Sequence, residues 1–87
     1  MEINNISCLL VEDDPQISAY ITSLLKRQNW ISSVIHVASL EEATSALESQ
    51  SFDLILLDII LSDGSSIEHI PSYKAKQPQS KILIFTQ

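Results

Sequence analysis

Two short apolar runs constrain the fold of this chain more than any other feature. Cys8–Val11 and Leu54–Leu57 are uninterrupted apolar stretches, and a segment with helical spacing follows each of them. Runs of this length are typical of strands that are buried on both faces of a parallel sheet, with helices packed against it. The pattern therefore predicts an α/β fold built on a parallel sheet.

Acidic residues follow both runs. Glu12 and Asp13 come directly after the first, and Asp58 comes directly after the second. Ligands of open α/β sheets bind at the carboxyl ends of the strands, where parallel neighbours that end at one level bring such side chains together. Clustered carboxylates repel one another, and a hard divalent cation is the simplest reason for them. The sequence predicts a Mg²⁺ site at this edge of the sheet.

Length, charge and cysteine content exclude several classes of protein. The 87 residues leave room for one small domain, over residues 1–87. The net charge of -6 and the scattered Lys and Arg residues argue against nucleic-acid binding by this chain alone. Cys8, the single cysteine, is expected in the core. The sequence shows neither a signal peptide nor a membrane span, so no membrane contact and a cytoplasmic location are expected.

Capping signals place the helices. Asp14 followed by Pro predicts a helix over about residues 15–28, because Asp is a good N-cap and Pro is favoured at the first helical position. A capping box that begins at Ser39 predicts a second helix. Another begins at Ser65, but Pro71 falls inside that helix, which should be kinked or begin late. Strands are expected over residues 34–37, 52–58 and 81–86.

Four segments, in order and in register, resemble the receiver domain of bacterial two-component response regulators. They are Leu9–Pro15, Phe52–Asp58, Asp63–Gly64 and Ile82–Thr86. The resemblance covers the whole chain. It implies a flavodoxin-like, doubly wound sheet with strand order 2-1-3-4. It also implies that the family's fourth helix, fifth strand and fifth helix are lacking, so that the domain is incomplete at its C-terminal side.

The resemblance also implies a role for each candidate site residue. Asp58 would be the phosphoacceptor, taking a phosphoryl group from a histidine kinase or a phosphotransfer protein. Glu12 and Asp13 would hold Mg²⁺ together with Asp58 and the backbone carbonyl of Ile60, and Thr86 would be the switch hydroxyl. Phosphoryl transfer needs an in-line nucleophile and a cation, which these residue types supply. The expected function is that of a phosphoaccepting signalling domain that switches partner contacts, not that of an enzyme.

Two consequences follow for the 87 residues as printed. The family's lysine after a fifth strand is not among them, and Lys81 begins strand four, roughly 17 Å from the acidic edge. Phosphoryl uptake catalysed by the chain itself is therefore expected to be impaired. Strand four would be an edge, and its apolar run Ile82–Phe85 predicts self-association through that strand.

Two other functional classes stay open. One is a receiver-like module that binds proteins without phosphorylation, which a spectral response to Mg²⁺ with beryllofluoride or a small phosphodonor would distinguish. The other is an unrelated Mg²⁺-dependent phosphatase or nuclease. Phosphatases of the haloacid-dehalogenase type carry a second Asp where Ile60 stands, which argues against that class. His36 and His69 lack partners at metal-ligand spacing and are not expected to bind zinc.

Overall fold

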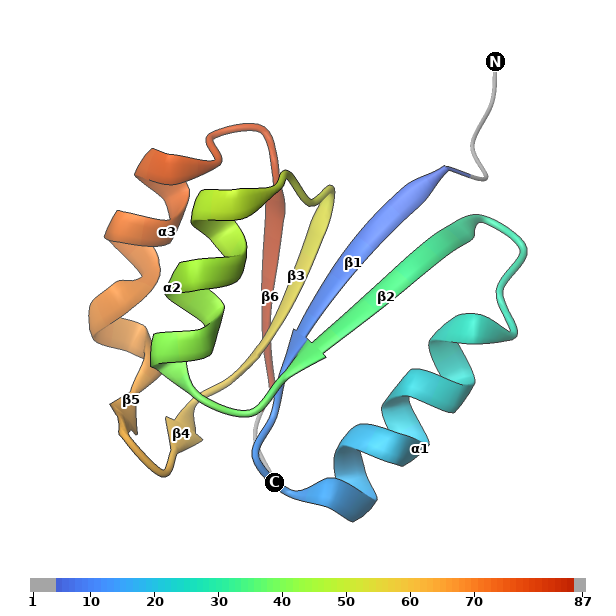
Figure 1. Ribbon diagram of the computed structural model, residues 1–87, viewed down its shortest axis with the longest axis horizontal. Coiled ribbons are helices and arrows are strands. Elements are labelled where there is room, and N and C mark those ends of the chain that lie inside the picture. The colour runs from blue at the N-terminus through green and yellow to red at the C-terminus, as the bar shows by residue number, and fades with distance from the viewer. Residues whose placement is uncertain (1–4, 86–87) are drawn as a thin grey trace.

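The parallel sheet predicted from the apolar runs is present in the computed structural model, which describes residues 5–85. Four strands pair in the order β2-β1-β3-β6, all of them parallel (Figure 1). Since β6 is the fourth strand of this sheet along the chain, the α/β class and the 2-1-3-4 order are confirmed. The elements, in chain order, are β1 (Ile6–Val11), α1 (Pro15–Lys26), β2 (Ile31–Val37), α2 (Leu40–Ser49), β3 (Leu54–Asp58), β4 (Ile60–Leu61), β5 (Gly64–Ser65), the 3-10 helix η1 (Ser66–His69), α3 (Ile70–Lys76) and β6 (Lys81–Phe85).

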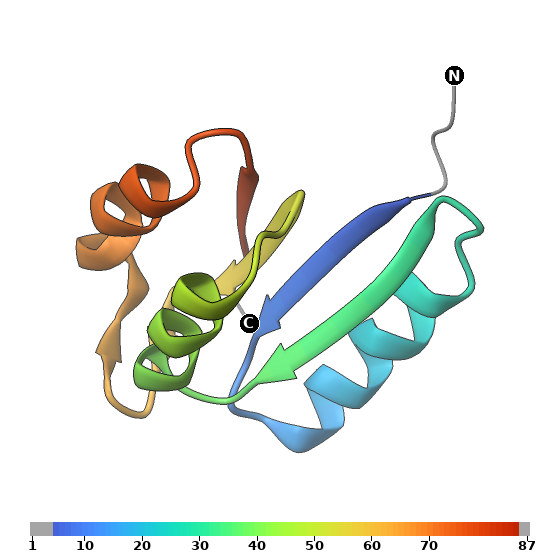
Figure 2. The ribbon, with the colours of Figure 1, turned by 45° about the horizontal axis from the view of Figure 1, so that its top comes forward.

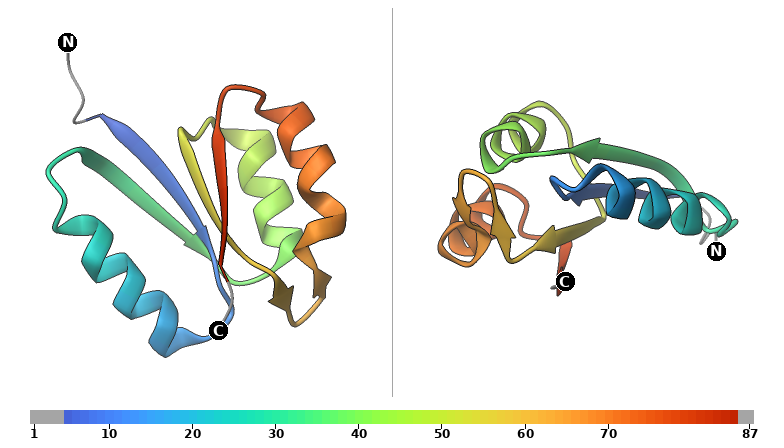
Figure 3. Two further views of the ribbon diagram at one scale, coloured as in Figure 1. Left: turned by 180° about the vertical axis from the view of Figure 1, so that it is seen from behind. Right: turned by 90° about the horizontal axis from the view of Figure 1, so that it is seen from below.

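Helices cover the two faces of the sheet unequally. The α2 and α3 helices lie on one face, and α1 lies on the other, where it packs on β1 and β2 (Figure 3). The main core lies between the sheet and the α2–α3 pair. Its buried members are Leu9, Val11, Leu40, Ala43, Leu47, Phe52, Ile55, Leu57, Leu61 and Tyr73. Side chains of β3 and β6 that point to the α1 side have no helix of the described chain packed directly over them.

The first two helices begin where their caps predicted. The carboxylate of Asp14 accepts hydrogen bonds from the backbone N–H groups of Gln16 and Ile17, at 2.8 and 3.1 Å. The Ser39 hydroxyl accepts one from Glu42 N–H at 3.1 Å. These bonds satisfy donors that the first helical turn leaves without partners, which fixes where each helix starts.

Strand boundaries differ from the sequence prediction at two places. β2 begins at Ile31, not at residue 34, because Ile31 and Ser33 pair with β1 although the serine interrupts the apolar pattern. β3 begins at Leu54, not at Phe52. The N–H of Phe52 donates to the side chain of Gln77 at 2.8 Å, so its hydrogen bond goes to the helix layer.

The third helix begins late, as Pro71 predicted. Residues Ser66–His69 form one turn of 3-10 helix, and the α-helix follows from Ile70 with Pro71 in its first turn, where no N–H is needed. The Ser65 hydroxyl accepts from Ile67 N–H at 3.4 Å and caps the 3-10 turn.

A small hairpin after β3 was not predicted. β4 and β5 pair antiparallel, Ile60 with Ser65 and Leu61 with Gly64, and they lie beside the start of α2 (Figures 1 and 2). Gly64 has a φ of 140°, which side-chain-bearing residues rarely adopt. The two-residue loop of the hairpin is Ser62-Asp63, and Gly64 follows it as the first residue of β5.

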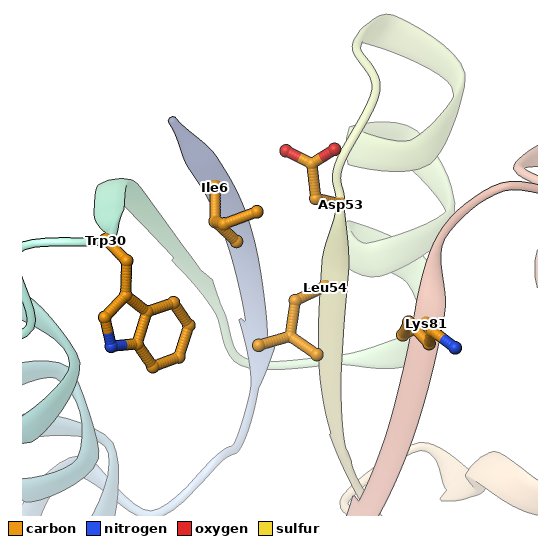
Figure 4. Close-up of a pocket in the computed structure, with 5 residues that line it drawn as sticks. All are labelled: Ile6, Trp30, Asp53, Leu54 and Lys81. Carbon is orange, nitrogen blue, oxygen red and sulfur yellow. The ribbon is translucent and has the colours of Figure 1, made fainter. Parts of the chain in front are cut away.

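An apolar hollow of about 490 Å³ opens at the other end of the sheet, where the strands begin. Ile6, Leu54 and the Trp30 ring face it, Asp53 stands above it, and Lys81 flanks it from β6 (Figure 4). Glu12 and Asp13, after β1, and Asp58, the last residue of β3, lie at the opposite end of the sheet. None of the helices in residues 5–85 has the length and apolarity needed to cross a bilayer.

Candidate functional site

Glu12 is held in place at the carboxyl end of β1 by its backbone and its side chain. Its N–H donates to the carbonyl of Val37 at 3.1 Å, which extends the pairing of β1 with β2 by one residue. Its carboxylate accepts the N–H of Asp14 at 2.9 Å. The side chain of Glu12 is 0% exposed, so its position is set by the fold.

Asp58 is the last residue of β3 and is paired with Phe85 of β6. The N–H of the next residue, Ile59, donates to the carbonyl of Phe85 at 3.1 Å, and Ser66 N–H donates to the carbonyl of Ile59 at 2.8 Å. These bonds fix the backbone just beyond Asp58, whose side chain is 3% exposed.

The three predicted carboxylates meet at one point. One oxygen from each of Glu12, Asp13 and Asp58 lies within 4.8 Å of the other two. Opposite ligands of an octahedral Mg²⁺ shell lie about 4 Å apart, since each bond is about 2.1 Å long. Hard oxygen ligands at this spacing, two buried and one exposed, fit a small divalent cation that keeps several of its waters.

The pKa of Glu12 reflects the unfavourable energy of burying this carboxylate beside two others. Burial raises the pKa of Glu12 above its ordinary value, because it penalises the charged form, while the hydrogen bond from Asp14 N–H opposes that rise. The negative charges of Asp58 and Asp13 raise the pKa further. A cation among the three oxygens would reverse the effect of those charges.

Other residues named from the sequence lie around the cluster or apart from it. Ile60 is in β4, two residues beyond Asp58, and its side chain is exposed. Thr86 lies outside the described residues. Lys81 pairs with Leu54 at the far end of β3 from Asp58, as the sequence predicted for the start of that strand.

Two contacts of this region were missed in the sequence. The Nε2 atom of His36 lies 2.7 Å from the backbone carbonyl of Glu12, so the histidine supports the strand end without joining the carboxylate cluster. Asp63, in the turn of the β4–β5 hairpin, accepts the N–H groups of Leu40 and Glu41 at 3.0 and 3.2 Å. The available signal was the position of Asp63 before the only glycine, which marks a turn but not its partner.

The chain matches the model of the response regulator receiver domain over residues 8–87. It therefore belongs to the response regulator receiver family, whose members are signalling domains that act with histidine kinases or phosphotransfer proteins. Two curated relatives match most of the chain. The chain is 32% identical over 62 residues to the heme response regulator HssR of Staphylococcus saprophyticus, and 31% identical over 81 residues to the swarming motility regulation protein RssB of Serratia marcescens.

These matches cover 71% and 93% of the chain but only 27% and 36% of the two relatives. Among solved structures, MaeR bound to beryllium trifluoride is 26% identical with a TM-score of 0.86, over 94% of this chain and 67% of that one. A Burkholderia pseudomallei response regulator with a phosphorylated aspartic acid has the same TM-score at 22% identity, over 94% of this chain and 47% of that one, and it shows the shared fold.

Proposed function

We propose that this chain is a phosphoaccepting receiver domain that takes a phosphoryl group onto Asp58 with Mg²⁺ held by Glu12, Asp13 and Asp58. The observation that carries the proposal is the convergence of these three carboxylates within 4.8 Å, at the strand ends where the sequence predicted them. The family match supports it. So does MaeR, a regulator of this fold that has been solved with beryllium trifluoride bound.

In this proposal each residue has a separate task. A carboxylate oxygen of Asp58 attacks the phosphorus of a phosphohistidine in line, the P–N bond breaks, and the imidazole leaves with the electron pair and gains a proton. The product on the chain is an acyl phosphate, a labile species suited to a reversible signal. Bound Mg²⁺ supplies positive charge for the phosphoryl oxygens. Glu12 and Asp13 orient the site, since backbone hydrogen bonds and burial already hold Glu12.

Two further assignments belong to the same proposal. The backbone carbonyl of Ile60 completes the protein's ligands to the cation, and the hydroxyl of Thr86 closes onto the phosphoryl group and changes the surface that partners meet. The partner is a histidine kinase or a phosphotransfer protein, as phosphodonor.

Labelling with acetyl phosphate, followed by mass spectrometry of proteolytic fragments, tests the assignment. We expect slow, Mg²⁺-dependent labelling of the fragment that contains Asp58, no label in Asp58→Asn, and label retained in Asp53→Asn. Asp53 is a suitable control because it lies at the opposite end of β3 and is exposed. Undiminished labelling of Asp58→Asn would place the acceptor elsewhere. A chain that binds Mg²⁺ but takes no label from acetyl phosphate or a phosphorylated kinase would instead be a binding module that works without phosphorylation.

A further inference from the structure

The β4–β5 hairpin, which follows Asp58, is joined to the start of α2 by a side chain from its own turn. Both oxygens of the Asp63 carboxylate are used, since Oδ1 accepts the N–H of Leu40 at 3.0 Å and Oδ2 accepts the N–H of Glu41 at 3.2 Å. The first N–H groups of a helix have no partner within the helix, so Asp63 satisfies two of them. The contact fixes the hairpin beside α2, where Figure 2 shows it.

Apolar packing holds the same hairpin against α2. Leu61 of β4 and Leu40 of α2 are both buried and belong to one core cluster. The backbone of Gly64 runs beside Leu40, since a Cβ atom built on this glycine would lie 3.5 Å from the Cδ1 atom of Leu40. A shift of the hairpin relative to α2 would therefore disturb the core as well as the hydrogen bonds of Asp63.

The hairpin also sets the direction of the Ile60 carbonyl. Ser66 N–H donates to the carbonyl of Ile59 at 2.8 Å, so the Ile59 carbonyl is turned toward the returning strand. Carbonyl groups of successive strand residues point to opposite sides. The carbonyl of Ile60, which pairs with Ser65, is therefore turned away from β5 and lies outside the pairing of the hairpin.

We infer that Asp63 is a positioning residue for the Mg²⁺ site, because its anchor on α2 holds the hairpin that presents the carbonyl of Ile60. The inference rests on the proposed function, in which that carbonyl joins the three carboxylates as a ligand. Asp63 is not a member of the carboxylate cluster, so it acts on the site through the hairpin. Mg²⁺ demands nearly ideal octahedral geometry, and a ligand on a loosened hairpin binds it less tightly.

Isothermal titration calorimetry with MgCl₂ tests the inference. We expect Asp63→Ala to raise the dissociation constant for Mg²⁺ about fivefold or more. Asp63→Asn should fall between wild type and Asp63→Ala, since its amide keeps one acceptor oxygen for the N–H groups of α2. Both variants lose the same charge, so this order separates anchoring of the hairpin from long-range attraction of the cation.

Ser39→Ala is the matched control. The Ser39 hydroxyl accepts the N–H of Glu42 at 3.1 Å, so it caps the same turn of α2 from the residue that precedes the helix. Ser39→Ala and Asp63→Ala should both lower stability toward urea, because each removes a cap. Only Asp63→Ala should weaken Mg²⁺ binding, because the dissociation constant of a fully folded chain does not depend on its margin of stability.

Unchanged Mg²⁺ affinity in Asp63→Ala would overturn the inference and leave the proposed site intact. Equal losses in Asp63→Ala and Asp63→Asn, or in Asp63→Ala and Ser39→Ala, would also overturn it, in favour of charge or of the α2 start in general. A wild type that binds no Mg²⁺ would overturn both the proposed site and this inference. If Asp63→Ala fails to fold by circular dichroism, Asp63→Asn is compared with Glu41→Gln, which removes one charge from an exposed side chain of α2, and equal losses would then overturn the anchoring role.

Discussion

Glu12 and Asp58 lie at positions where a carboxylate side chain destabilises the fold. Each is at most 3% exposed, and each lies near two other carboxylates. Burying a carboxylate costs free energy unless hydrogen bonds or a cation compensate for lost water, and neighbouring negative charge adds to the cost. A fold selected for stability alone would place apolar residues at such positions. Local conflict of this kind is expected at functional sites.

This conflict leads to a prediction about Mg²⁺. A cation bound among the three oxygens stabilises the folded chain by mass action, by about 2.7 kcal/mol at 100 times its dissociation constant if the unfolded chain binds none. For a domain of this size the melting temperature should rise by roughly 10–20 °C. A thermal scan with and without saturating Mg²⁺ measures the shift. Asp13→Ala should remove most of it while keeping the fold, because Asp13 is exposed. A melting temperature indifferent to Mg²⁺ in wild type would contradict the site.

The sequence predicted the residues of the cluster because their positions depend on local rules. A strand ends where an apolar run ends, and parallel strands end at one edge, so Glu12, Asp13 and Asp58 could be placed together. The contacts of His36 and Gln77 could not be predicted. Each joins segments more than twenty residues apart, and nothing in a local pattern specifies which backbone group a side chain will reach.

Among the elements, the β4–β5 hairpin connects the site to α2 through Asp63. The N–H groups of Leu40 and Glu41 donate to its carboxylate, and these hydrogen bonds lower the pKa of Asp63 below its ordinary value of 3.8. A carboxylate with a lowered pKa stabilises the fold above its unfolded-state pKa, and this contribution is lost as the pH falls through the folded-state value. The start of α2 is therefore held by a charge from the segment that follows Asp58.

Asp63→Asn should thus destabilise the chain at pH 7, because the amide keeps only one acceptor oxygen for two donors and loses the charge near the helix N-terminus. The difference in unfolding free energy between wild type and Asp63→Asn should shrink as the pH falls below 3.8 and Asp63 takes up a proton. Urea unfolding of both proteins at pH 7 and pH 3 measures it. A difference that grows toward low pH would contradict the capping role.

The contact between α2 and the end of α3 depends on one buried amide. Gln77 accepts the N–H of Phe52 at 2.8 Å and donates to the carbonyls of Leu47 and Gln50 at 3.1 and 2.7 Å. Gln77→Leu removes all three bonds and leaves buried partners unsatisfied, which should cost about 2–4 kcal/mol. Gln79→Leu, at an exposed position two residues on, is the control and should change stability little. Equal effects of the two substitutions in urea unfolding would contradict the role of Gln77.

Element boundaries were predictable where a cap or a proline sets them and less so elsewhere. Asp14, Ser39 and Pro71 each act on their own helix, so both early helices and the late start of α3 followed from the sequence. The β4–β5 hairpin has only two residues in each strand, too few for a periodic pattern. β2 was predicted too short because Ser32 and Ser33 interrupt its apolar pattern, although Ser33 pairs with Ser7 of β1 and the Ser32 hydroxyl donates to the carbonyl of Ile6.

At the scale of the whole molecule, the acidic cluster and the apolar hollow lie at opposite ends of the sheet. The cluster follows the carboxyl ends of β1 and β3, whereas the hollow opens where the strands begin. The residues of the cluster and the residues that line the hollow have no member in common. Changes at the acidic cluster and changes at the hollow should therefore be separable by mutation.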